Sequence, residues 1–155
     1  MIATPAGFGS WIYVLEDGDE PLATIKPPSI LNKSGEITMG AVPFAIEAEG
    51  LTGGTLRLLF EGLVVATAER QTSFWRRYHV TLDASLAVDT PTDLVLASQF
   101  GIRAFALEAD GERLGMIRRA SLLRRNAEVE ILESVPLVVK AFCLAVVLVE
   151  WRRSS

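Results

Sequence analysis

The stretch Val135-Pro-Leu-Val-Val-Lys-Ala-Phe-Cys-Leu-Ala-Val-Val-Leu-Val149 is apolar apart from Pro136 and Lys140, and Glu150-Trp151-Arg152-Arg153 follows it. Its length and composition predict a helix over about 135–151, with the charged residues that follow returning the chain to water. A helix that is apolar all round must be surrounded by protein or by lipid. The identity of these surroundings decides the architecture.

Three features favour protein as the surroundings of this helix. About 15 helical residues at about 1.5 Å each reach about 22 Å, which is short of a hydrocarbon layer of about 30 Å. Lysine in the middle of a membrane costs about 2.5 to 3.5 kcal/mol, and Lys140 lies well inside the run. A C-terminal anchor would also carry Arg152 and Arg153 across the membrane, against the preference for cytoplasmic positive charge. We predict a helix wrapped by protein, with a membrane-embedded helix as the alternative.

Composition predicts one domain over residues 1–155. The chain is 50% hydrophobic with a mean hydropathy of +0.32, which fits a large buried interior. A net charge of −4 gives the whole molecule no electrostatic reason to bind nucleic acid. Cys143 is the only cysteine, which excludes an intramolecular disulfide, and no secretory signal opens the sequence. We therefore expect a cytoplasmic protein.

Short extended runs joined by tight turns dominate the rest of the chain. Glu61-Gly62 and Asp110-Gly111 are two-residue hairpin signals, and Asp17-Gly-Asp-Glu20 is an acidic turn. The runs that these turns join are residues 56–60 with 63–67, 102–109 with 112–118, and 11–16 with 22–26. Residues 43–49 form a further run, whereas Pro27-Pro28 and Asn32-Lys-Ser-Gly35 have the composition of loops.

Two segments have mixed or ambiguous patterns. Around residues 74–82 the alternation predicts an amphipathic strand with Phe74, Tyr78, Val80 and Leu82 on one face. Thr90-Pro91-Thr92-Asp93 can cap a short helix that ends before Gly101, although Leu94-Val-Leu96 would serve equally as a strand. We favour the helix for residues 91–100.

Together these elements predict an α+β, mainly β, fold. Many antiparallel strands leave two sheet edges to protect, and the terminal helix needs apolar neighbours on every side. Closing the sheet around the helix satisfies both requirements. A helix about 10 Å wide needs more than eight strands, so we predict a closed antiparallel barrel of about 12 strands with the hydrophobic C-terminal helix buried inside. Small residues at Ala141, Cys143 and Ala145 ease the fit, and Lys140 needs the barrel mouth or Glu133 as a partner.

The C-terminal half resembles a known family. The segments that carry the resemblance are Phe105-Ala-Leu-Glu-Ala-Asp-Gly111, Leu114-Gly-Met-Ile117, Val129-Glu-Ile-Leu132 and Leu137-Val-Val-Lys-Ala-Phe142 before the apolar helix. They are similar to tubby-like C-terminal domains, closest to the LURP-one-related and phospholipid scramblase branches. The resemblance implies a 12-stranded barrel around a C-terminal helix, and it implies contact with membrane lipid.

The sequence departs from the family pattern where function is concerned. The acidic stretch associated with calcium in scramblases is represented here only by Glu128, Glu130 and Glu133, without an aspartate, and the cysteine-rich segment is missing. We predict no calcium or other metal site and no cofactor.

Arginines provide the candidate binding residues. Residues 111–125 hold five arginines against Glu112, although the first 50 residues are acidic. Guanidinium groups match phosphate oxygens, so we predict a lipid- or anion-binding role for six residues: Arg118, Arg119, Arg124, Arg125, Arg152 and Arg153. The alternatives are a solvated turn for the first four and an ordinary solvent-exposed helix end for the last two.

Function follows from these residues only in outline. We predict a non-enzymatic binding or scaffold domain that contacts anionic membrane lipid or a protein partner, located in the cytoplasm or at the membrane periphery. A scramblase-like protein and a carrier of a small apolar ligand are the alternatives. His79 is the only histidine, so a catalytic triad would have to use it, and we expect it to be an ordinary surface residue. The sequence does not indicate the oligomeric state.

Overall fold

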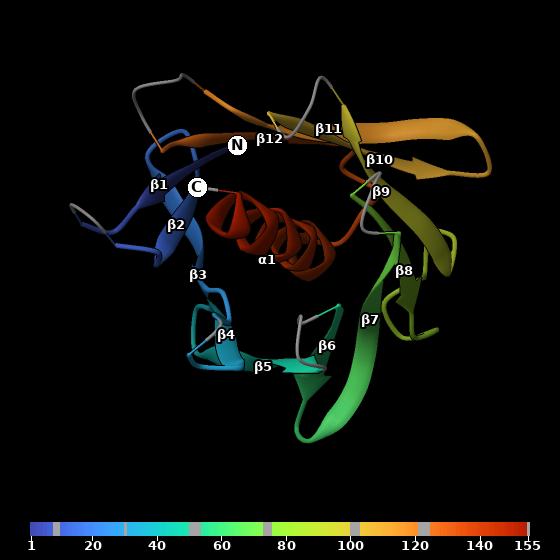
Figure 1. The fold of residues 1–155 in the computed structure, drawn as a ribbon, viewed down its shortest axis with the longest axis horizontal. Helices are drawn as coiled ribbons and strands as arrows, with labels where there is room; N and C mark the ends of the chain where they lie inside the picture. Colours follow the sequence, from blue (N-terminus) through green and yellow to red (C-terminus); the bar gives the residue numbers. More distant parts are fainter. Residues whose placement is uncertain are drawn as a thin grey trace.

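The computed structural model describes residues 1–7, 10–29, 31–49, 54–72, 76–99, 103–120 and 125–154. In these residues an antiparallel sheet closes on itself around one helix (Figure 1). The elements in chain order are β1 (Ile2–Pro5), β2 (Tyr13–Asp17), β3 (Glu20–Lys26), β4 (Ser34–Met39), β5 (Val42–Glu49), β6 (Thr55–Phe60), β7 (Leu63–Thr72), β8 (Arg77–Leu82), β9 (Asp93–Gln99), β10 (Ala104–Ala109), β11 (Glu112–Arg119), β12 (Ala127–Ile131) and α1 (Leu137–Arg153). The predicted 12-stranded barrel with a buried C-terminal helix is confirmed.

The barrel is a meander that closes between its first and last strands. Each strand pairs with its neighbour in sequence, and β1 then pairs with β12 through Ile2 opposite Glu128 and Ala3 opposite Ala127. The N-terminal amine reinforces this closure by donating a hydrogen bond to the carbonyl of Val129 at 3.0 Å. Among the described strands, this closure leaves no sheet edge unpaired, as the sequence analysis expected.

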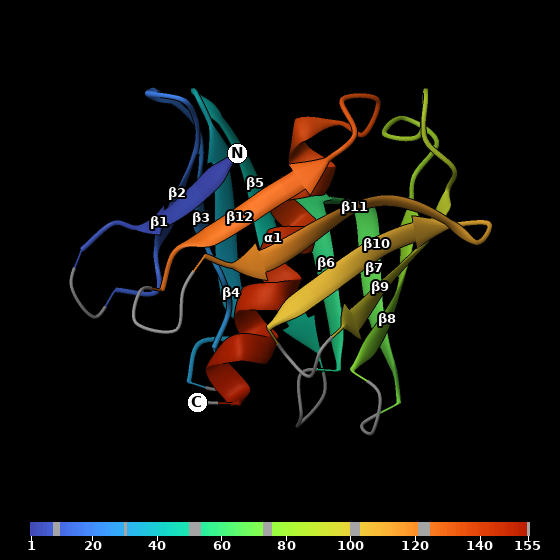
Figure 2. The same ribbon diagram turned by 90° about the horizontal axis from the view of Figure 1, so that it is seen from above.

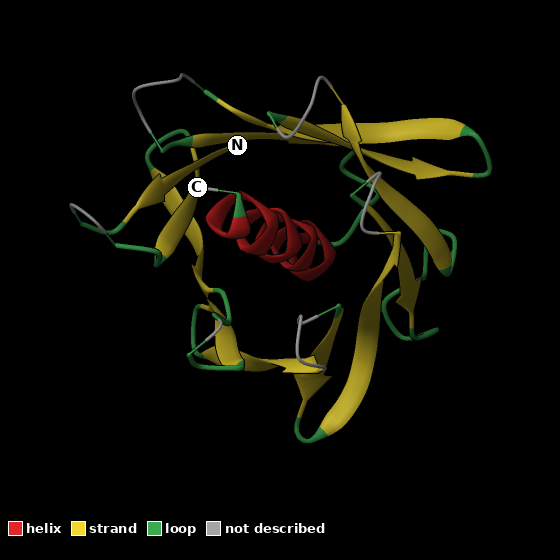
Figure 3. Cartoon of the chain, in the orientation of Figure 1, coloured by secondary structure: helices red, strands yellow, loops and turns green. Residues whose placement is uncertain are grey.

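Helix α1 lies inside the barrel and is buried on all sides (Figures 1 and 3). It begins at Leu137, after Pro136, whose missing N–H costs nothing at a helix start. Every residue from Val138 to Trp151 is buried. The helix continues two residues beyond the predicted end because Glu150 and Trp151 lie within the barrel, so the prediction that they return the chain to water was wrong.

The segment 91–100 contains a strand, and the preference for a helix there was wrong. Strand β9 pairs with both β8 and β10, and Leu94 and Leu96 are buried at alternate positions. A helix would have left a gap in the barrel between β8 and β10. The need of these two neighbours for a pairing partner overrides the local capping signal of Thr90 and Asp93.

The hairpin predictions are confirmed, with local adjustments. Both central residues of the Glu61-Gly62 and Asp110-Gly111 turns have positive φ, as a type I′ turn requires. Strand β8 begins at Arg77 and buries Tyr78, Val80 and Leu82, as expected, whereas Phe74 lies outside the described residues. The loop prediction for residues 32–35 was wrong at its end, because Ser34 and Gly35 belong to β4.

Gly115 on β11 marks a close approach of two strands. A Cβ at this position would lie 2.3 Å from the Glu130 carbonyl oxygen and 2.5 Å from Ile131 Cα, both backbone atoms that cannot move aside cheaply. We expect Gly115→Ala to lower the free energy of unfolding by about 1 to 3 kcal/mol, measured by urea denaturation. Gly7→Ala is the control, since nothing lies within 4 Å of its Cβ position. Equal stability of the two variants would contradict this account of Gly115.

Candidate functional site

The antiparallel meander sorts the charged residues between the two ends of the barrel. Helix α1 begins at one end, with the turns after β2, β4, β6, β8 and β10, and it finishes at the other end (Figure 2). We call the first the acidic end and the second the basic end, and we assign each charged residue by the half of the element, or the connection, in which it lies.

The two ends have opposite charge in the described residues. The acidic end has two basic side chains, Arg113 and Lys140, against thirteen acidic ones, which are Glu16, Asp17, Asp19, Glu20, Glu61, Asp83, Asp89, Asp93, Glu108, Asp110, Glu112, Glu130 and Glu133. The basic end has twelve basic side chains, which are Lys26, Lys33, Arg57, Arg70, Arg76, Arg77, Arg103, Arg118, Arg119, Arg125, Arg152 and Arg153. Six acidic residues accompany them, which are Glu36, Glu47, Glu49, Glu69, Glu128 and Glu150.

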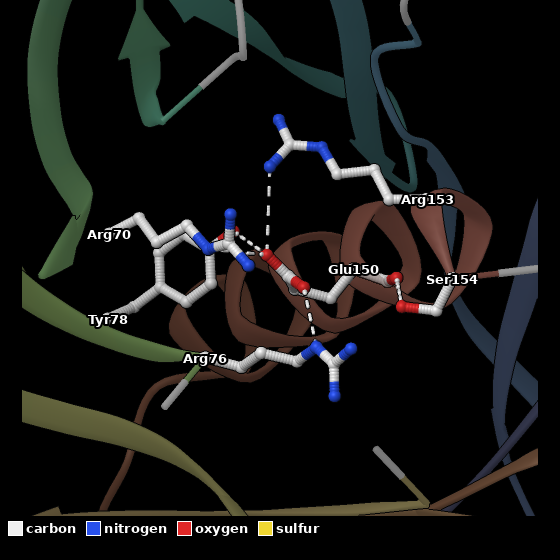
Figure 4. Close-up of polar contacts among 6 residues, drawn as sticks. All are labelled: Arg70, Arg76, Tyr78, Glu150, Arg153 and Ser154. Carbon is white, nitrogen blue, oxygen red and sulfur yellow. Dashed lines mark hydrogen bonds and ion pairs between the residues drawn. The ribbon is translucent and has the colours of Figure 1, made fainter. Parts of the chain in front are cut away.

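A buried carboxylate organises the centre of the basic end. Glu150 is 1% exposed and accepts a hydrogen bond of 2.6 Å from the Tyr78 hydroxyl (Figure 4). Arg70 Nε lies 3.1 Å from one carboxylate oxygen, an ion pair without hydrogen-bond geometry. Arg76 Nε lies 3.8 Å from the other oxygen. The three residues come from β7, the turn before β8 and β8 itself, so the carboxylate ties the end of α1 to the barrel wall.

Positive charge exceeds negative charge around Glu150. Arg153, one turn further along the helix, places Nη1 3.7 Å from the same carboxylate, so three guanidinium groups surround one carboxylate. Burial, followed by the charge of Glu150 and the hydrogen bond to it, raises the pKa of the Tyr78 phenol, which therefore stays a neutral donor. Three arginines from β7, from the turn before β8 and from α1 therefore share one buried carboxylate at this end of the barrel.

Tryptophan rings hold further arginines at the basic end. The guanidinium carbon of Arg125 lies 4.3 Å from the Trp11 ring centre, and that of Arg152 lies 5.2 Å from the same ring. The guanidinium carbon of Arg119 lies 4.9 Å from the centre of the Trp151 ring. Arg125 also donates to the Ser10 carbonyl, and Tyr13 donates to the Arg125 carbonyl at 2.9 Å. Such stacking fixes the direction of an arginine while it keeps its charge.

The structure brings together most of the arginines that the sequence singled out. Arg119, Arg125, Arg152 and Arg153 gather around the end of α1 through the contacts described above. Arg118 instead lies on the outer wall, where its Nε is 2.7 Å from Glu128. Arg124 lies outside the described residues.

Sequence reasoning missed Arg70, Arg76 and Glu150 as members of this cluster. A signal for Arg70 was available, because it continues the inward alternation of Ala66 and Ala68 along β7. An arginine at an inward position of a barrel strand needs a buried acidic partner or an opening to solvent. Glu150 follows an apolar helix directly and is the acidic residue that such an arginine would meet.

The other reactive side chains of the described residues do not belong to this arginine cluster. His79 places Nε2 3.0 Å from Asp93 on the outer wall. Cys143 is buried in α1, and burial raises the pKa of its thiol to about 12. Within the described ranges no group of three or more His, Cys, Asp or Glu residues is placed to hold a metal ion. No ion pair joins Lys140 to Glu133 in the described chain, and Lys140 lies at the acidic end with 8% of its surface exposed.

Among the residues that the structure describes, no helix is both long enough and apolar enough to cross a membrane. Comparison of the chain with family models, curated proteins and solved structures finds no match. The resemblance to tubby-like C-terminal domains therefore stays a prediction from the sequence.

Proposed function

We propose that this chain is a non-enzymatic binding domain that rests its basic end on anionic membrane lipid, as a peripheral protein of the cytoplasmic leaflet. The segregation of charge between the two ends carries the proposal. A uniformly acidic barrel would be repelled by anionic headgroups in every orientation. This barrel is repelled only through its acidic end, so the same field that attracts the basic end also orients the molecule.

The residues of the basic end suit a lipid surface in kind as well as in charge. Ten of the twelve basic side chains there are arginines, whose forked donors match phosphate oxygens. Trp11 is partly buried and contacts the guanidinium groups of Arg125 and Arg152, and Leu31 is 98% exposed in the connection between β3 and β4. Aromatic and apolar side chains beside cations are typical of residues that sit at headgroup depth.

Vesicle flotation tests this proposal. We expect the protein to float with vesicles that contain phosphatidylserine and to stay unbound with phosphatidylcholine alone. Arg77 and Arg103 are exposed at the basic end. A basic residue near an anionic surface contributes about 1 kcal/mol, so Arg77→Gln with Arg103→Gln should weaken binding about thirtyfold. Arg113→Gln, at the acidic end, is the control and should bind as the unmodified chain does.

Two results would overturn the proposal. One is equal flotation of the protein with both kinds of vesicle. The other is an equal loss of vesicle binding in Arg113→Gln and in Arg103→Gln. Raised salt supplies a further check, because binding that depends on exposed charges must weaken as salt screens them.

A further inference from the structure

The acidic end of the barrel carries exposed apolar side chains among its carboxylates. Leu63 is 72% exposed and Val64 is 47% exposed at the start of β7, just after the Glu61-Gly62 turn. Val42 is 42% exposed at the start of β5, which is separated from β7 by β6. Val88, in the connection between β8 and β9, is 80% exposed. Exposed apolar side chains inside a ring of one charge are typical of a surface that receives a partner of the opposite charge.

The complement of this surface is present on the same chain. The basic end holds a surplus of arginines, and it also exposes Leu31 and Ile12. Both ends are formed by the same strands of one closed barrel. Two acidic ends repel each other and two basic ends repel each other, which disfavours a symmetric pair. We propose that the acidic end of one copy receives the basic end of a second copy, so that the barrels stack head to tail.

Such a contact has consequences that a symmetric dimer would not have. A head-to-tail interface uses two different surfaces, so each new copy leaves one free end of each charge and growth continues beyond the dimer. The contact is made between exposed charges and weakens as salt rises. It covers the basic end that we propose for lipid, so anionic vesicles and a second copy compete for the same arginines. The stacking itself does not require that membranes be bound.

Analytical ultracentrifugation of the full chain over a range of concentrations tests the proposal. At low ionic strength we expect the average mass to rise with concentration above that of the 16.9 kDa monomer, and at high salt we expect it to return to the monomer. A mass that stays at the monomer at every concentration in low salt overturns the proposal. An oligomer that is unaffected by salt overturns it too, since the contact would then not depend on charge.

Two charge-reversed variants make the test specific to the two ends. An acidic-end variant carries Glu20→Lys, Glu61→Lys and Asp89→Lys, and a basic-end variant carries Lys26→Glu, Arg77→Glu and Arg103→Glu. All six positions are exposed. Each variant weakens one of the two surfaces, so each alone should show a lower average mass than the unmodified chain at the same concentration. An equimolar mixture should show a higher average mass than either variant alone, because each variant keeps the end that the other needs.

The mixture also excludes misfolding as an explanation, because an unfolded variant cannot restore the contact. A mixture whose average mass is no higher than that of either variant alone, although both variants show the circular dichroism of the unmodified chain, overturns the proposal. The acidic-end variant separates this inference from the proposed function, because it keeps the basic end and should still float with anionic vesicles. Loss of vesicle binding with stacking retained would remove the lipid proposal alone.

Discussion

Glu150→Gln is expected to lower the free energy of unfolding by about 3 to 5 kcal/mol, measured by urea denaturation with tryptophan fluorescence. The substitution removes the carboxylate and leaves Arg70, Arg76 and Arg153 facing one another. The loss is costly because the buried Nε of Arg70 no longer has the opposite charge that compensated its removal from water. The shape of the side chain is almost unchanged, so the loss reports on charge and not on packing.

Glu128→Gln is the matched control for this prediction. It removes the same charge from a carboxylate that also pairs with an arginine, Arg118, but this pair lies at the surface with the Glu128 side chain 29% exposed. Exposed ion pairs contribute about 0 to 1 kcal/mol, so the control should cost no more than that. Equal small losses for both variants would show that Glu150 does not hold the end of the helix to the wall.

Leu144→Ala should destabilise the protein by about 2 to 5 kcal/mol. Leu144 is fully buried at the middle of α1, inside a closed wall that cannot collapse onto the space left by the missing side chain. The loss therefore includes a cavity as well as the lost transfer free energy. Urea denaturation should give a lower midpoint with an unchanged slope, because the surface exposed on unfolding is the same.

Leu63→Ala makes the same chemical change at a position that is exposed to solvent. We expect it to change the free energy of unfolding by less than about 0.5 kcal/mol. Equal losses in the free energy of unfolding for Leu144→Ala and Leu63→Ala would mean that α1 is not enclosed by the barrel, and would contradict the fold.

The helix and the barrel were predictable for a physical reason that lies in a few residues. The run that includes Phe142 and Leu144 is apolar at every helical position, so it demands neighbours on all sides, and only a closed sheet supplies them without leaving edges. Asp110 tolerates the positive φ that it adopts before Gly111, and Glu61-Gly62 is a two-residue connection between apolar runs, so both hairpins were identified locally. Such signals do not depend on distant parts of the chain.

The errors occurred where distant residues decide the outcome. Residues 93–99 form a strand because β8 and β10 each need a partner, and neither neighbour is visible in the local sequence. Glu150 is buried because Tyr78, Arg70 and Arg76 come to it from residues more than 70 positions earlier. The arginine pairs of residues 118–125 were noticed by local density, whereas the division of charge between two ends appears only once the direction of each strand is known.

The order of the elements affects how the chain folds during its synthesis on the ribosome. Strand β1 pairs with β12, and the amine of Met1 bonds a carbonyl 128 residues away, so the barrel cannot close before β12 has been synthesised. The helix that fills its interior follows every strand. Until that helix has emerged, the inward side chains of the whole meander have nothing to pack against, and contacts this distant in sequence form slowly. The nascent chain therefore passes through a long interval in which its future core is open to chaperones, and to other chains of its own kind.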